Sequence, residues 1–155
     1  MAHTAVCVPD VNAAVAWYTE VLGLRVLSPP YLMEGPQIEQ DMGELVPSPV
    51  AVHAAILGFE PDDRVLEVIE YPNARGAARP ALGLTETGFT HIGLLCDEID
   101  QTRAELEEKG VRFLTAGVAG IAGLRTTWFV DPYGIVFILL QKGASDRPYY
   151  RQFTG

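Results

Sequence analysis

Three side chains in this sequence could act together as ligands of a metal ion: His3, Glu67 and His91. The two histidines begin two similar segments. Each segment predicts a short apolar strand, an amphipathic helix that ends at a glycine (Gly23 or Gly110), and a second strand. An internal repeat of this length indicates that one supersecondary unit is used twice, which would let both histidines reach one shared site.

Glu67 supplies the carboxylate of this set. It stands between Leu66 and Val68 in a predicted strand over 64–71, so alternation places it on one face with apolar neighbours. A carboxylate in that setting needs a partner, or its burial costs about 2 kcal/mol or more. Two imidazoles and one carboxylate suit a divalent Zn, Fe, Ni, Co or Mn ion, and three protein ligands leave positions open for water or substrate. Glu70 has the opposite parity and is expected to be solvated.

The remaining elements follow from periodicity and from turn residues. Strand 3–8 places His3 and Cys7 on one face, and Asp10 or Asn12 can cap the helix that follows. A hairpin is expected from 50–59 and 64–71. The second half predicts a helix over 99–109 and two strands, 125–130 and 135–141, joined by a turn at 131–134.

Three stretches lack regular periodicity. Residues 28–49 contain several prolines and are expected to form a long irregular loop, either a flap over a pocket or a simple insertion. Met33 belongs to this stretch. Residues 72–88 are expected to link the two halves, and the glycine-rich 116–123 is expected to be flexible.

Composition limits the class of protein. The 155 residues carry a formal charge of −9 and fit one domain, 1–155. That charge argues against nucleic acid and anionic membrane as partners, and is compatible with a cationic ligand or simply with solubility. No apolar run is long enough to span a membrane, and no leader pattern opens the chain, so a cytoplasmic location is expected. Cys7 and Cys96 lie on predicted strands and are expected to be buried thiols.

Four motifs in order resemble the vicinal oxygen chelate superfamily, which includes glyoxalases, bleomycin resistance proteins and extradiol dioxygenases. They are His3 with the segment Val11–Leu24, then Leu66-Glu67-Val68, then Thr90-His91-Ile92-Gly93, and Asp131-Pro132-Tyr133-Gly134. The resemblance implies an α+β fold of two paired βαβββ modules, forming a curled mixed sheet around a central cleft. Module one would cover about 1–72, a linker 73–89, module two 90–143 and a C-terminal tail 144–155. It also implies a homodimer, to which Tyr149, Tyr150 and Phe153 of the tail could contribute.

The resemblance implies four cleft ligands, of which this chain matches three. His3 and His91 match the strand-start pair, and Glu67 matches the carboxylate of module one. The resemblance also makes Glu67 the candidate catalytic base. The chain has Ile138 where the family usually has a second glutamate. The expected function is a metal-dependent glyoxalase-like lyase or isomerase, whose small-molecule substrate chelates the metal through neighbouring oxygens. The alternatives are an extradiol-type dioxygenase with a 2-His-1-carboxylate iron site, and a metal-free binding or antibiotic resistance protein.

Further candidates could line the cleft beside these ligands. His53 is a possible fourth ligand or substrate contact, although a satisfied buried histidine is the simpler interpretation. The other candidates are Cys7, Met33 and Ile138.

Overall fold

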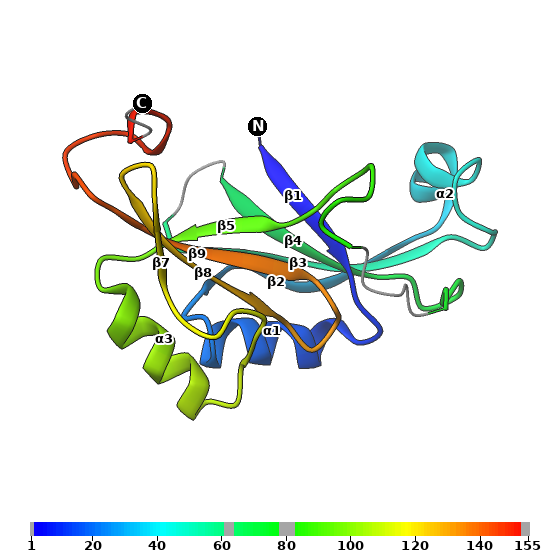
Figure 1. The fold of residues 1–155 in the computed structure, drawn as a ribbon. Coiled ribbons are helices and arrows are strands. Elements are labelled where there is room, and N and C mark those ends of the chain that lie inside the picture. The colour runs from blue at the N-terminus through cyan, green and yellow to red at the C-terminus, as the bar shows by residue number, and fades with distance from the viewer. Residues whose placement is uncertain (1, 61–63, 78–82, 153–155) are drawn as a thin grey trace. The chain divides into compact units, whose positions relative to one another are not determined.

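The computed structural model describes residues 2–60, 64–77 and 83–152, which fall into two compact units, Met1–Ala77 and Ala78–Gly155. The first unit contains β1 (His3–Cys7), α1 (Val11–Glu20), β2 (Arg25–Glu34), α2 (Pro36–Met42), β3 (Ala51–Gly58) and β4 (Val65–Glu70). The second unit contains β5 (Ile92–Leu95), α3 (Ile99–Glu108), β6 (Arg112–Phe113), β7 (Ala119–Ile121), β8 (Leu124–Val130), β9 (Val136–Lys142) and the short helix η1 (Tyr149–Arg151) (Figure 1).

Both units use the same strand order. The first sheet runs β1-β4-β3-β2, and the second runs β5-β9-β8-β6, with β7 also pairing with β8. In each sheet the first and last strands of the unit are parallel, and the other pairs are antiparallel. The predicted α+β fold of two βαβββ modules is confirmed. The hairpin expected from 50–59 and 64–71 is the antiparallel pair β3 and β4.

One face of the first sheet packs against α1. Asp10 caps this helix by accepting a hydrogen bond from the Ala13 amide at 3.0 Å, and Gly23 follows it with the positive φ of a C-terminal cap. The helix buries Val11, Ala14 and Tyr18, which recur at helical spacing. Burying a side chain of the size of Val11 stabilises the fold by about 1.5–3 kcal/mol. The sheet contributes alternate, buried residues to the same core: Val6, Val8, Ala55, Leu57, Leu66 and Val68.

Glu70 lies on this helix-facing side and is only 7% exposed, so its predicted solvation is wrong. Its Oε2 accepts a hydrogen bond from the Val11 amide at 3.1 Å, and its Oε1 accepts one from Arg75 at 2.8 Å. The carboxylate therefore satisfies a free amide at the start of α1, where negative charge is favoured by the helix dipole. Gln141 does the same without charge in the second unit, accepting from the Ile99 amide at 3.3 Å.

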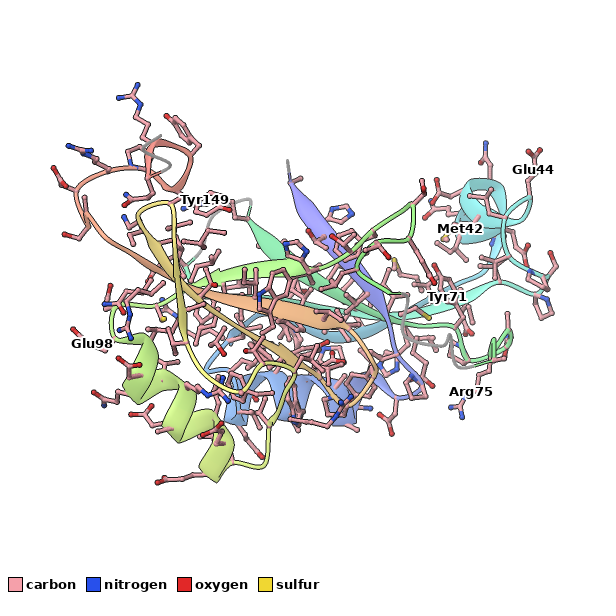
Figure 2. The ribbon with its side chains drawn as sticks, in the orientation of Figure 1. Met42, Glu44, Tyr71, Arg75, Glu98 and Tyr149 are labelled. Carbon is pink, nitrogen blue, oxygen red and sulfur yellow. The ribbon has the colours of Figure 1, made fainter. Side chains whose placement is uncertain are left out.

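Replacing Glu70 with alanine is expected to lower the free energy of unfolding by about 1–3 kcal/mol, because a buried amide loses its acceptor. Glu70→Gln should cost less, since an amide oxygen can accept the same bond, as Gln141 does. Urea denaturation measures both changes. Glu44→Ala is the matched control on an exposed residue (Figure 2) and should stay within about 0.5 kcal/mol. Equal losses for Glu44→Ala and Glu70→Ala would contradict this role.

The stretch 28–49 is not the irregular loop that its prolines predicted. β2 continues through Pro29 and Pro30, with two register shifts relative to β3, and α2 follows with Pro36 in its first turn. Prolines are tolerated here because β2 is the edge strand of its sheet. Glu39 ties α2 to the start of β3 by accepting hydrogen bonds from the Val50 amide at 2.6 Å and the Ser48 hydroxyl at 2.8 Å.

In the second unit, α3 lies against β8 and β9 and buries Ile99 and Leu106. The rings of Phe129 and Phe137 stack in the core with their centroids 5.1 Å apart. The predicted flexible stretch 116–123 contains β7 instead. No helix among residues 2–60, 64–77 and 83–152 combines the length and apolar character needed to cross a membrane.

Candidate functional site

The first unit brings His3 and Glu67 together. β1 and β4 are parallel, with His3 opposite Val65 and Ala5 opposite Glu67, so both side chains project from the face that α1 does not cover. His3 Nε2 lies 3.4 Å from Glu67 Oε2, and the side chains are 53% and 19% exposed. A half-buried carboxylate beside an imidazole on an accessible face can bind a cation, hold a proton or contact a small molecule.

The separation of these two donors fits ligands of one metal ion. Zinc bonds to imidazole nitrogen and carboxylate oxygen are about 2.0–2.2 Å long, so two such donors at a tetrahedral angle lie about 3.4 Å apart. Within the part of the chain that the structure describes, no group of three or more His, Cys, Asp or Glu side chains is close enough together to hold a metal ion. The pair in the first unit therefore needs further ligands to form a metal site.

Cys7 shares the face of His3 and Glu67 but is exposed, and Cys96 is half-buried, so the predicted burial of both thiols is wrong. Burial of part of the side chain raises the pKa of the Cys7 thiol, and the Glu70 carboxylate raises it further. A thiol with a raised pKa stays protonated at neutral pH, which makes it a poor ligand and a poor nucleophile.

Tyr71 is a residue of this face that the sequence analysis missed. It follows β4 with the same parity as Glu67 and Ile69. Burial raises the pKa of its phenol, and Cys7 and Glu67 add to the shift, so the hydroxyl lies within electrostatic reach of Glu67 and remains a hydrogen-bond donor. The alternation of β4, extended by one residue, would have identified it.

His53 lies on the opposite face from His3 and Glu67. It pairs in register with Glu70, and its Nδ1 is 3.6 Å from Glu70 Oε2. The structure therefore places His53 beside the acidic residue at the start of α1, away from the candidate ligands. Met33 is different: it pairs with Val52 and lies on the face that carries Glu67.

The second unit holds His91 directly before β5. Its Nδ1 is 2.8 Å from the Thr90 hydroxyl, and its ring packs edge-to-face on Trp128 with centroids 4.8 Å apart. These contacts orient the imidazole. A histidine whose Nδ1 is held by a hydrogen bond can use Nε2 as a ligand, as ligating histidines commonly do.

Strand register identifies Ile138 as the counterpart of Glu67. Ala5, two residues after His3, pairs with Glu67, and Gly93, two residues after His91, pairs with Ile138. A Cβ added to Gly93 would lie 3.7 Å from Ile138 Cγ2, which places both positions on one face.

Helix capping gives the same correspondence. Glu70 lies three residues after Glu67, and Gln141 lies three residues after Ile138; each caps the first helix of its own unit. The second unit therefore presents an imidazole and an apolar side chain where the first presents an imidazole and a carboxylate.

The C-terminal tail turns back on itself. The Gln152 side-chain oxygen accepts a hydrogen bond from the Ala144 amide at 3.0 Å. Its nitrogen donates to the carbonyl oxygens of Ala144 at 2.7 Å and Arg147 at 2.9 Å. Tyr149 and Tyr150 are 42% and 69% exposed, while Phe153 lies outside the described residues.

Comparison with known proteins gives matches along most of the chain. The family model described as Glyoxalase/Bleomycin resistance protein/Dioxygenase superfamily matches residues 1–139. A probable chloroplastic lactoylglutathione lyase of Arabidopsis thaliana is 27% identical over 150 residues, covering 96% of this chain but 37% of the relative, so the chain spans little more than a third of that relative's length.

Two solved structures illustrate the likeness in fold. A glyoxalase family protein from Bacillus cereus superposes with a TM-score of 0.79 at 16% identity, covering 93% of this chain and 94% of that one. Glyoxalase I from Zea mays superposes with a TM-score of 0.65 at 20% identity, covering 96% of this chain and 46% of that one.

Proposed function

The chain belongs to the Glyoxalase/Bleomycin resistance protein/Dioxygenase superfamily, and from this membership we propose that it is a glyoxalase-like enzyme, a lyase or isomerase that requires one divalent metal ion. The observation that carries the proposal is the pairing of His3 and Glu67 at 3.4 Å on an accessible face. His91 is the proposed third ligand, because it occupies in the second repeat the place of His3 in the first.

The proposed substrate is a small molecule with two neighbouring oxygens, such as an α-hydroxy carbonyl compound. A bound Zn, Fe, Ni, Co or Mn ion would supply Lewis acidity that stabilises negative charge on those oxygens. Glu67 removes the proton next to the carbonyl group and returns it elsewhere on the substrate. Tyr71 lies on the same face of β4 as Glu67, and its hydroxyl, whose pKa is raised by burial, is available as a donor to a substrate oxygen.

Proton transfer in this proposal is one-sided. The position in the second unit that corresponds to Glu67 is Ile138, whose side chain neither donates nor accepts a proton. An enzyme that inverts a stereocentre with two bases needs a group on each face of the substrate. The proposal is therefore a single-base isomerisation or lyase reaction.

A second candidate function is an extradiol-type dioxygenase, because the chain offers one carboxylate beside two histidines. Two histidines and one carboxylate with open positions form the ligand set of non-haem iron oxygenases. In this chain the single carboxylate would be Glu67 in the first unit, with an apolar residue in place of the second carboxylate.

An exchange assay in ²H₂O tests the proposed function. The protein, loaded in turn with each of the five metals, is incubated with hydroxyacetone and followed by ¹H NMR, and separately with catechol in an oxygen electrode. The proposal expects metal-dependent exchange of the α-hydrogens without oxygen uptake. Oxygen consumption with catechol in the iron form would favour the dioxygenase. A protein that binds no metal and does neither would be a metal-free binding protein.

The proposal includes a homodimer in a reducing, cytoplasmic setting. The exposed rings of Tyr149 and Tyr150 support a contact between subunits, and the two free cysteines support the reducing compartment. Sedimentation at micromolar concentration, before and after deletion of 146–155, tests the dimer; a monomer in both cases would contradict it.

A further inference from the structure

The face that carries His3 and Glu67 continues into a surface of partly exposed apolar side chains, here called the apolar wall. Its members pack against the buried residues Val50, Val52 and Ala54 of the first unit. Figure 2 shows two of them, Met42 and Tyr71, at the same end of that unit. The members are Met33, Ile38, Met42, Val46, Ile69 and Tyr71.

The apolar wall begins beside the candidate ligands. Glu67, Ile69 and Tyr71 have the same parity along β4, and residues two apart on a strand are separated by about 7 Å. Met33 reaches the same face from β2 through its pairing with Val52. A small molecule bound at Glu67 can therefore lay an arm of a few carbon atoms along the wall.

The first unit has few positively charged side chains that could bind an anionic arm of a substrate. Residues 1–77 contain three arginines and no lysine against eleven Asp and Glu, a formal charge of −8 out of −9 for the chain. Arg25 pairs with Glu60, and Arg75 pairs with Glu70. No member of the apolar wall is charged. A carboxylate placed there would be desolvated and repelled without a cationic partner.

We propose that the apolar wall binds the uncharged aryl or alkyl arm of a neutral α-hydroxy carbonyl substrate, and that this surface selects against substrates with anionic arms. The inference rests on the proposed function and specifies its substrate class. Methionine side chains are flexible and make favourable contacts with aromatic rings, and the ring of Tyr71 can pack against an aryl group. The acidic charge of residues 1–77 sets the preference for a neutral ligand.

The three methionines of the chain allow a direct test. Labelling their methyl groups with ¹³C gives signals for Met33 and Met42, which belong to the apolar wall, and for Met1. The probes are 2-hydroxyacetophenone and its matched anion, 4-(2-hydroxyacetyl)benzoate. The neutral probe should shift the Met33 and Met42 signals saturably. It should also bind at least about tenfold more tightly than the anion, a difference of about 1.4 kcal/mol.

Matched variants separate the wall from the rest of the surface. Met42→Glu should weaken binding of the neutral probe at least about tenfold. Leu45→Glu places the same charge on a 79% exposed residue outside the wall and should leave binding unchanged. Equal affinities for the two probes, or equal effects of the two variants, would overturn the inference.

The methionine signals report binding without turnover, so the two proposals fail differently. If the signals shift in a protein that neither binds metal nor exchanges hydrogen, the proposed function is overturned. The proposal that the apolar wall binds the arm would still stand. The opposite result is exchange of the α-hydrogens of hydroxyacetone without any response of the Met33 and Met42 signals to 2-hydroxyacetophenone. It would overturn only the proposal that the apolar wall binds the substrate arm.

Discussion

Replacing Glu67 with glutamine is expected to lower turnover by about 10²–10⁴-fold, the usual contribution of a general base. The amide keeps the size and one ligating oxygen of the carboxylate but cannot accept the proton. Metal affinity should therefore fall much less than turnover. Steady-state kinetics and metal titration on the same preparation measure the two effects. A loss of turnover much larger than the loss of metal affinity indicates that Glu67 acts as a base and not only as a metal ligand.

The control for this prediction is Glu70→Gln, which makes the same chemical change at a carboxylate on the opposite, helix-facing side of β4. It should alter stability more than turnover. If Glu67→Gln lost metal and activity in equal proportion, Glu67 would be only a ligand. If it retained full turnover, Glu67 would not be the base.

Replacing Ile138 with glutamate is expected to tighten metal binding by about tenfold or more, because it restores a carboxylate at the position that register equates with Glu67. The new side chain would start beside Gly93 and Trp128, its partners across the strands. Turnover should fall, since a fourth protein ligand occupies a coordination position that substrate needs.

Ile138→Leu is the matched control and should change neither affinity nor turnover by more than a few-fold, because it conserves volume and polarity. A glutamate variant with parent-like metal affinity would show that the second-unit strand β9 does not face the bound ion. That result would also remove the argument for one-sided proton transfer.

Local patterns predicted much of the fold. Alternation predicted that His3 shares a face with Cys7 in β1 and that Glu67 shares one with apolar residues in β4, and the register of the two strands agrees. Asp10 caps the first helix and Gly23 follows its end, as expected from their residue types. The four ordered motifs also predicted the family, which the match over residues 1–139 confirms. These features depend on neighbours within a few positions, which a sequence displays directly.

The features that were missed depend on distant partners. Glu70 is buried because the Val11 amide, 59 positions away, and Arg75 satisfy its oxygens. Pro29 and Pro30 lie in a strand because β2 is at the sheet edge, where a missing amide costs no ladder hydrogen bond. Neither the sheet order nor the position of a helix start can be derived from the residues on either side of these positions.

Metal content most directly tests the central claim, that His3, Glu67 and His91 hold one divalent ion. The measurement is elemental analysis with metal titration of the parent and of the variants His3→Ala, Glu67→Ala and His91→Ala. His53→Ala is the control, because that imidazole lies on the opposite face beside Glu70. We expect one ion per chain in the parent and in His53→Ala. Metal affinity should fall more than about 100-fold in each of the other three variants, beyond the loss typical of an outer-shell partner. A parent without metal, or variants of His3 and His91 that bind it as the parent does, would contradict the account.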